Sequence, residues 1–327
     1  MLVECKKCIN TNENPSITFN GKGLCNVCER YLTNFNKDQL NQELKFLRSF
    51  IANKKYDAMV GISGGKDSTA VLYTVKEMGF TPLAFSFEIG YTTKDMFIRA
   101  REIARKIGVG YEVIDVRQHV GEKDRESFVK MAELYDEKEG NELRDKFRNL
   151  YEEGRKHYST KSDIAFPFVR PCQICRKIAI KSYYAEAQKR GIQVVIIGIN
   201  EWTGLSGNSY SAIRKLQPLK SKPPVYIVHL PFLLQRKLAD TKKILSKIGW
   251  QKPVSEKYVD TGSGTCYLAR ACEAKAARLL GFNMDSTRLA REVTIGFLTK
   301  KEAKSALSKI RRSEKSVKTV LKEAGLI

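Results

Sequence analysis

Long apolar segments are missing from this 327-residue sequence. It has no run of about 18 apolar residues that could cross a membrane, and its first residues, MLVECKKC, lack the apolar core of a signal peptide. We therefore expect a soluble, cytoplasmic protein. Histidine is scarce too, and His119, His157 and His229 stand in unrelated sequence contexts. Each is expected to pack or to face solvent rather than to bind a metal ion.

Acidic residues are few relative to basic ones. The chain has 58 Lys and Arg against 36 Asp and Glu, a formal net charge of +22. The basic excess is concentrated in residues 205–257 and 300–327, whereas residues 121–162 carry both signs. Such concentration is typical of surfaces that bind RNA or DNA, so we expect a polyanionic partner. A generally lysine-rich, solvated surface is the alternative.

The eight cysteines do not indicate disulfides in a protein expected to be cytoplasmic, and metal binding or thiol chemistry is expected instead. Cys5, Cys8, Cys25 and Cys28 form two CxxC pairs on either side of the turn sequence FNGKG. Four thiolates complete a tetrahedral shell, so we expect a zinc ribbon over residues 1–35 that Zn²⁺ stabilises. An iron centre of the rubredoxin type has compatible spacing.

A glycine-rich segment, SGGKDS, lies between the strand-like run YDAMVGI and the helical pattern DSTAVLYTVKEMG. Gly64 and Gly65 permit a tight turn. The helix that follows offers unpaired amides and a positive dipole end to an anion. Lys66 and the hydroxyls of Ser63 and Ser68 add a charge and hydrogen-bond donors. The segment therefore predicts a phosphate-binding loop.

SGGKDS is not a Walker loop, because Val60 stands where that motif needs glycine and Asp67 where it needs a hydroxyl. It resembles the pyrophosphate loop of the PP-loop ATP pyrophosphatases, over residues 50–235. The resemblance implies cleavage of ATP between the α and β phosphates, adenylation of an acceptor oxygen, and displacement of AMP by a nucleophile. It implies that residues 63–68 bind pyrophosphate, that Lys66 and Asp67 act in catalysis, and that Asp67 helps to hold Mg²⁺.

The surrounding patterns indicate an α/β fold with a doubly wound, mainly parallel sheet. TPLAFSFEIG, YEVIDV and IQVVIIGIN have the composition of strands, and TKDMFIRAREIARKIG that of a helix. Because ligands of such sheets bind beyond the carboxyl ends of strands, Ser86, Phe87 and Gly198 are expected to contact adenine and ribose. The expected organisation is a zinc ribbon at 1–35, a PP-loop domain at 36–240 with a helical insertion at about 121–162, and a basic, mainly helical C-terminal region at 241–327.

Cys172 and Cys175 form a third CxxC, at the start of the predicted helix QICRKIAIKSYYAEAQKRG. The helix N-terminus and two flanking arginines are expected to lower the pKa of both thiols. Two thiolates do not complete a metal site, and the two remaining cysteines lie about ninety residues downstream. A cluster or sulfur-carrying role, a redox disulfide and inert structural thiols are all compatible with the pair.

The order of these motifs resembles that of the PP-loop tRNA thiolases, which make 2-thiouridine or 2-thiocytidine. The resemblance rests on the CxxC followed by arginine and a helix, on the strand end IIGIN, and on LPFLLQRKLADTKKIL before Cys266. It implies that Cys172, Cys175 and Cys266 hold a four-iron, four-sulfur (4Fe-4S) cluster with one open iron site. It also implies tRNA as acceptor, and a donor protein or sulfide as the sulfur source. Cys272 is the less suitable third ligand, and a homodimer is compatible with these features.

Two other functions have support in the sequence. The stretch CKKCINTNENPSITFNGKGLCNVC ahead of a PP-loop resembles the N-acetyl sugar amidotransferases of surface polysaccharide synthesis, over residues 1 to about 120. That resemblance implies a nucleotide-sugar acceptor and ammonia from a partner glutaminase. A non-catalytic, zinc-ribbon RNA-binding module is the third possibility. The intact Ser63, Lys66 and Asp67 argue against it.

Overall fold

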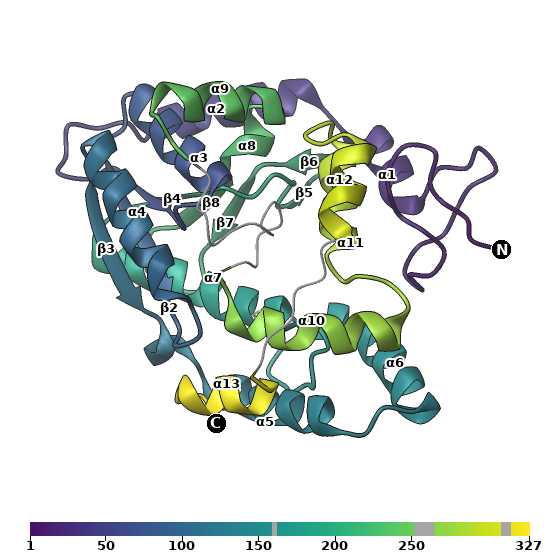
Figure 1. Cartoon of the computed structure of the whole chain (residues 1–327). Coiled ribbons are helices and arrows are strands. Elements are labelled where there is room, and N and C mark those ends of the chain that lie inside the picture. The colour runs from purple at the N-terminus through teal and green to yellow at the C-terminus, as the bar shows by residue number, and fades with distance from the viewer. Residues whose placement is uncertain (159–161, 252–264, 309–314) are drawn as a thin grey trace.

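A central sheet of six strands organises the protein, whose computed structural model describes residues 1–158, 162–251, 265–308 and 315–327 (Figure 1). The strands follow the order β3, β2, β1, β4, β8, β7, and all but β7 run parallel. Their bounds are β1 Ala58–Gly61, β2 Pro82–Glu88, β3 Gly110–Asp115, β4 Val194–Ile197, β7 Ile213–Leu216 and β8 Val225–His229. A hairpin of β5 Gly204–Ser206 and β6 Ser209–Ser211 forms a second, small sheet. The expected α/β fold with a mainly parallel sheet is confirmed.

The strand order reverses beside β1. On one side Val60 lies opposite Ala84 of β2, and on the other side it lies opposite Ile196 of β4. In open α/β sheets ligands bind beyond the carboxyl ends of the strands at such a reversal. The segment that follows β1 is SGGKDS, so the topology places the predicted phosphate-binding loop at this position.

Helices cover both faces of the sheet, because successive side chains of a strand point to opposite faces. Ala58 and Val60 share a core with α2, α3, α4 and α8, while Met59 shares a second core with α5, α6, α7, α10 and α13. None of the helices in the described ranges is long and apolar enough to cross a membrane. The helices are α1 Asn26–Asn34, α2 Lys37–Arg48, α3 Lys66–Glu77, α4 Lys94–Ile107, η1 Arg117–His119, α5 Glu122–Asp136, α6 Asn141–His157, α7 Pro171–Lys189, α8 Leu230–Leu233, α9 Leu238–Lys247, α10 Tyr267–Leu280, α11 Ser286–Thr294, α12 Lys300–Leu307 and α13 Val317–Glu323.

The C-terminal helices are distributed over the rest of the molecule. The predicted boundary after residue 240 lies inside α9, which packs on α3. Helices α10 and α13 pack on α6 and α5, the two helices of the predicted insertion. Helices α11 and α12 share a core with the four N-terminal cysteines (Figure 1) through Leu289, Val293 and Ala303. The N-terminal ribbon and the C-terminal region are therefore in direct contact.

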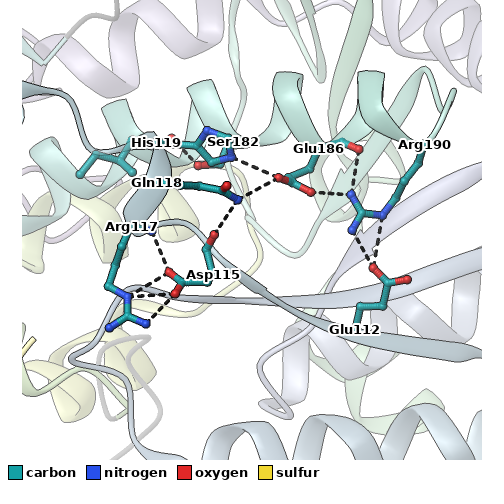
Figure 2. A network of polar contacts seen from close by, with 9 residues as sticks. Glu112, Asp115, Arg117, Gln118, His119, Ser182, Glu186 and Arg190 are labelled. Atoms are coloured by element: carbon teal, nitrogen blue, oxygen red, sulfur yellow. Dashed lines mark hydrogen bonds and ion pairs between the residues drawn. The ribbon is translucent and has the colours of Figure 1, made fainter.

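A polar network fixes α7 against β3, and Figure 2 shows its members. Arg190 forms ion pairs with Glu186 at 2.5 Å and with Glu112 at 2.7 Å, and His119 Nε2 lies 3.1 Å from Glu186 Oε1. Burial alone would raise the pKa of Glu186, but hydrogen bonds from Arg190 and His119 outweigh burial and lower it. Because α7 begins with the CxxC pair, this network helps to set the position of the two thiols. His119 has the packing role expected for it.

His229, at the end of β8, is buried, and its Nδ1 lies 2.6 Å from the carbonyl oxygen of Glu201. Burial lowers its pKa to about 4, so the folded protein holds a neutral imidazole at pH 7. The unfolded chain titrates near pH 6.5, so between about pH 6.5 and pH 4 it binds a proton that the folded protein excludes. Stability should therefore be complete above about pH 6.5 and decrease by about 3 kcal/mol as the pH falls to about 4.

Urea unfolding as a function of pH measures this loss. His229→Asn keeps an N–H donor but cannot be protonated, so its stability should change less than that of the wild type across the same pH range. Equal slopes for the two proteins would contradict the assignment of the pH dependence to His229.

Candidate active site

The loop between β1 and α3 is held in a conformation that requires glycine. Gly64 has φ +71°, and a Cβ there would lie 2.9 Å from Arg99 Cβ and 3.3 Å from the amide nitrogen of Ala100. Gly65 is extended and caps α3 without a side chain. The loop can therefore pass close to α4. The first amides of α3 have no helical partners and can bind an anion.

Internal hydrogen bonds hold the loop. The Ser63 amide donates to Ser68 Oγ at 3.1 Å, and the Ser68 hydroxyl lies 3.2 Å from the Gly65 carbonyl oxygen. Trp250 Nε1 donates to the Gly64 carbonyl oxygen at 3.0 Å, which ties the segment after α9 to the loop. Side chains from within the loop and from the segment after α9 therefore hold the loop backbone.

Ser86, Phe87 and Gly198, the other residues predicted to bind the nucleotide, have different surroundings. Gly198 lies directly against the loop, since a Cβ there would be 3.1 Å from the Cα of Ser68. Phe87 stacks on Tyr183, with ring centroids 5.1 Å apart. Ser86 is buried, and its hydroxyl donates to the carbonyl oxygen of Ile62. The Ser86 side chain thus links β2 to the residue after β1, and it also accepts a hydrogen bond from the Tyr111 hydroxyl of β3 at 3.0 Å.

Buried oxygen atoms collect beside the loop. Lys66 Nζ lies 3.1 Å from Asp67 Oδ2, while Asp67 Oδ1 is buried and has no hydrogen-bond partner among the described residues. Asn200 Oδ1, just after β4, is likewise buried and unpartnered in the described structure. Asn200 Nδ2 lies 3.5 Å from Glu292 of α11, whose pKa is raised by burial and by the charge of Asp67. Oxygen donors of this kind fit Mg²⁺, and Asp67 has a carboxylate oxygen available for it.

One residue of α11, Arg288, links the loop to the CxxC pair. Its guanidinium lies 2.6 Å from Glu292 and 3.7 Å from Asp285, and it interacts with the charge of Asp67. The same Arg288 and Asp285 act on the Cys172 thiol. Cys172 and Asp285 also line one recess of about 30 Å³. The phosphate-binding loop and Cys172 therefore share α11 as a wall.

The loop after β2 brings two of the other cysteines together. The Tyr91 hydroxyl lies 2.8 Å from Cys175 Sγ, and the Tyr91 carbonyl oxygen accepts a hydrogen bond from the amide of Tyr267. Thr92 forms an isolated β-bridge with Cys266, which begins α10. The thiols of Cys172, Cys175 and Cys266 are close enough to interact electrostatically. The structure thus gathers cysteines that are about ninety residues apart in sequence.

The predicted lowering of the thiol pKa values is wrong. Burial raises the pKa of Cys172, although Arg170 opposes the effect, and it raises the pKa of Cys175 well above its usual value. It raises the pKa of Cys266 to about 12. The loss of water around the thiols outweighs the helix dipole and the arginines. In the metal-free protein these thiols are protonated at neutral pH, and a bound metal would have to displace their protons.

The fourth cysteine of this region is less suited to bind a ligand. Cys272 is fully buried in the core of α10 and interacts with the Tyr135 hydroxyl. Cys172 is exposed, and Cys175 and Cys266 are partly buried. Cys172, Cys175 and Cys266 do not form one of the compact metal-binding groups of the described residues, whose ligand atoms lie within 4.8 Å of one another. A cluster of several atoms separates its thiolates more widely than a single ion does.

The four N-terminal cysteines do form such a compact group, and all four are fully buried. Cys8 and Cys25 have their sulfur atoms 3.6 Å apart. Tetrahedral Zn²⁺ with Zn–S bonds of about 2.3 Å requires about 3.8 Å between sulfurs, so the donor set fits a single ion. Amides of the ribbon donate to these sulfurs, and Thr294 Oγ1 of α11 lies 3.1 Å from Cys28 Sγ. The ribbon therefore supports α11 from the side opposite the loop.

Known proteins share the loop region. The sequence model of the queuosine biosynthesis protein QueC matches residues 57–160, beginning at the strand that leads into SGGKDS. A 7-cyano-7-deazaguanine synthase of Polynucleobacter asymbioticus is 40% identical over 60 residues, 18% of this chain and 24% of that protein. Both similarities lie at the loop and support the PP-loop ATP pyrophosphatase superfamily. They support ATP-dependent chemistry of the PP-loop type at this loop.

Two other proteins align with nearly the whole of this chain. An uncharacterized protein of Methanocaldococcus jannaschii is 22% identical over 314 residues, which cover 94% of each chain. The structure of NMN synthetase from Francisella tularensis aligns with 89% of this chain and 94% of that one, at 14% identity and a TM-score of 0.36. Neither similarity identifies the acceptor that this PP-loop enzyme uses.

Several residues of the PP-loop site were not found by sequence reasoning. Tyr91, Trp250, Arg288 and Glu292 stand outside recognisable motifs, and each reaches the site from a distant part of the chain. Only Asn200 had a local signal, as the last residue of the strand end IIGIN. An unpaired polar residue just beyond a predicted parallel strand is a reasonable site candidate.

Gly64→Ala tests the loop conformation. The new methyl group would contact the α4 backbone and strain a residue with positive φ, so we expect at least tenfold weaker ATP binding, measured by calorimetry. Gly79→Ala is the matched control, because Gly79 has φ +94° at the other end of α3 with nothing within 4 Å of its Cβ position. The control should lose about 1 kcal/mol of stability and keep its ATP affinity. Equal ATP affinities in the two variants would show that the close approach to α4 is unimportant.

Proposed function

We propose that this PP-loop enzyme adenylates an oxygen of a tRNA base and then replaces that oxygen with sulfur. The observation that carries the proposal is the shared wall formed by α11. Asn200, beside the loop, lies 3.5 Å from Glu292 of α11, and Arg170, just before the CxxC pair, donates to Thr287 of the same helix at 3.1 Å. Both halves of the proposed reaction therefore have sites that adjoin α11.

The loop residues account for the ATP part of the reaction. Lys66 and the unpaired amides of α3 bind the two phosphates that leave as pyrophosphate. Asp67 holds Mg²⁺ through its buried, unpartnered Oδ1. The bound ion neutralises phosphate charge. Arg288, beside Asp67, can stabilise charge on the α-phosphate while the acceptor oxygen attacks it.

The three accessible cysteines account for the sulfur part. Cys172, Cys175 and Cys266 would hold a 4Fe-4S cluster, which when bound would supply an open iron site that can carry sulfide. Tyr91 orients Cys175 through its hydroxyl and fixes Cys266 through the neighbouring β-bridge.

The distribution of lysines favours a polyanionic acceptor. Between β7 and the end of α9, seven lysines are exposed, and none forms an ion pair with a described acidic residue. They are Lys215, Lys220, Lys222, Lys237, Lys242, Lys243 and Lys247. The C-terminal basic residues contribute less, since Lys300 and Lys304 pair with Glu4, and Lys318 pairs with Asp136. Exposed lysines without ion pairs are suited to contacts with RNA phosphates.

A second candidate function is an amidotransferase that acts on an N-acetyl sugar nucleotide. The observation that favours it is the direct contact between the ribbon and the active-site wall, through Cys28 and Thr294. This contact makes the ribbon part of the site's support, as expected if the resemblance of the N-terminal region reflects function. In this case Asp67 and Lys66 keep their roles, and ammonia replaces sulfide as the nucleophile.

Anaerobic purification distinguishes the two. With a cluster, we expect about three to four iron atoms per chain and broad visible absorption. Cys172→Ala and Cys266→Ala should lose both, because each removes a ligand. Cys272→Ser is the control: its sulfur lies in the core beside Tyr135, so the variant should keep its iron. Zinc alone after reconstitution with iron and sulfide would contradict thiolation and favour the amidotransferase.

A further inference from the structure

Two arginines outside the phosphate-binding loop lie near each other at the carboxyl end of the sheet. Arg176 is on the second turn of α7, directly after Cys175, and its guanidinium carbon lies 5.6 Å from the centre of the Tyr158 ring. Arg214 is on β7, opposite Ile227 of β8. Its neighbour Ile213 packs into the core on the face of α2 and α8, so Arg214 points to the face covered by α7. Both side chains are partly buried.

These two arginines have no acidic partner of their own among the described residues. Neither forms an ion pair with a carboxylate, whereas Arg291, which faces the same region, forms a 2.6 Å ion pair with Glu201. Glu201 is also the carboxylate that interacts with Arg176. His229 adds no charge, because its pKa of about 4 leaves it neutral at pH 7. Glu201, the carboxylate that interacts with Arg176, is therefore already paired with Arg291.

An excess of buried positive charge is costly unless an anion is bound. Burial lowers the pKa of Arg214, and the charge of Arg176 lowers it further, which shows that the two cations oppose each other. Arg190, which is also partly buried, has Glu186 and Glu112 as partners. The planar guanidinium is suited to bind an oxyanion through two parallel hydrogen bonds.

We propose that Arg176 and Arg214 form a second anion site, which binds a phosphate group of the acceptor rather than a phosphate of ATP. The loop at residues 63–68 has its own cations, Lys66 and Arg288, and the pair Glu201–Arg291 adjoins the second site. Because Arg176 follows Cys175, a phosphate bound there would place the acceptor next to the thiols. The assignment of the anion to the acceptor rests on the proposed function, but the existence of the site does not.

The proposed phosphate can come from two sources. A tRNA would supply a backbone phosphodiester, and a nucleotide sugar would supply a diphosphate. Arginine recognises both through the same oxygen atoms, so the chemistry of the site does not depend on the choice. The experiment below has one arm for each source.

Arg176→Gln and Arg214→Gln test the site, with Lys189→Gln as the matched control. Lys189 lies in the last turn of α7, at the other end of the helix from Arg176, and is exposed, so its substitution removes the same charge away from the site. Thermal unfolding is measured at constant ionic strength with and without inorganic phosphate, while α,β-methylene ATP occupies the loop. In the wild type and in Lys189→Gln, phosphate should raise the Tm. In both arginine variants this rise should fall by at least half.

Stability without phosphate separates binding from a structural role. If the arginines repel each other, Arg214→Gln should be as stable as the wild type or more stable in phosphate-free buffer. A structural arginine would instead leave the variant equally destabilised with and without phosphate. That result, or an unchanged phosphate effect in both arginine variants, would overturn the proposal.

Titrations with total tRNA and with UDP-N-acetylglucosamine identify the source. Weakening of tRNA binding by about tenfold in the arginine variants, with a smaller salt dependence, supports the site and a tRNA phosphate. Weakening confined to UDP-N-acetylglucosamine supports the site but contradicts tRNA as the acceptor. If the arginine variants bind both tRNA and UDP-N-acetylglucosamine as tightly as the wild type, the assignment of the anion to the acceptor is overturned.

Discussion

The position of α11 is the constraint on which the rest of the active site depends. This nine-residue helix lies between the ribbon and the phosphate-binding loop, and each side of it has a different function. Leu289, Val293 and Thr294 contact the cysteine ribbon, while Arg288 and Glu292 reach Asp67 and Asn200. A ribbon with too few apolar residues to fold alone thus becomes a fixed support once a metal ion closes its four thiolates. A metal ion bound by these four thiolates would therefore help to hold α11 in position.

Helix α11 also adjoins both the nucleotide loop and the cysteines proposed to carry sulfur. The loop after β1 and the start of α7 lie at the carboxyl end of one sheet, where open α/β folds bind ligands. Helix α11 closes that region, and Tyr91 brings Cys266 to Cys175. The nucleotide loop is shared with other PP-loop enzymes, whereas the thiols and the arginines Arg176 and Arg214 lie where an acceptor would have to enter. Differences between acceptors are therefore expected in these elements rather than in the loop.

Local patterns were sufficient to predict the loop, the ribbon and the parallel strands. SGGKDS, the two CxxC pairs and the apolar runs each depend on neighbouring residues, and the structure places them as expected. The contacts of Arg288 and Glu292 with Asp67 could not be predicted, because they join residues more than 200 positions apart. The pKa of Cys172 was predicted in the wrong direction for a related reason. The helix start that lowers it is visible in the sequence, but the burial that raises it depends on the whole fold.

The acceptor is the central claim, and nucleoside analysis of tRNA tests it most directly. Total tRNA is compared from the wild-type strain, a strain that lacks this gene, and deletion strains that carry either the wild-type gene or Asp67→Asn. The account predicts that one thionucleoside is absent from the deletion strain, returns with the wild-type gene, and stays absent with Asp67→Asn. An unchanged set of thionucleosides in the deletion strain would contradict the account.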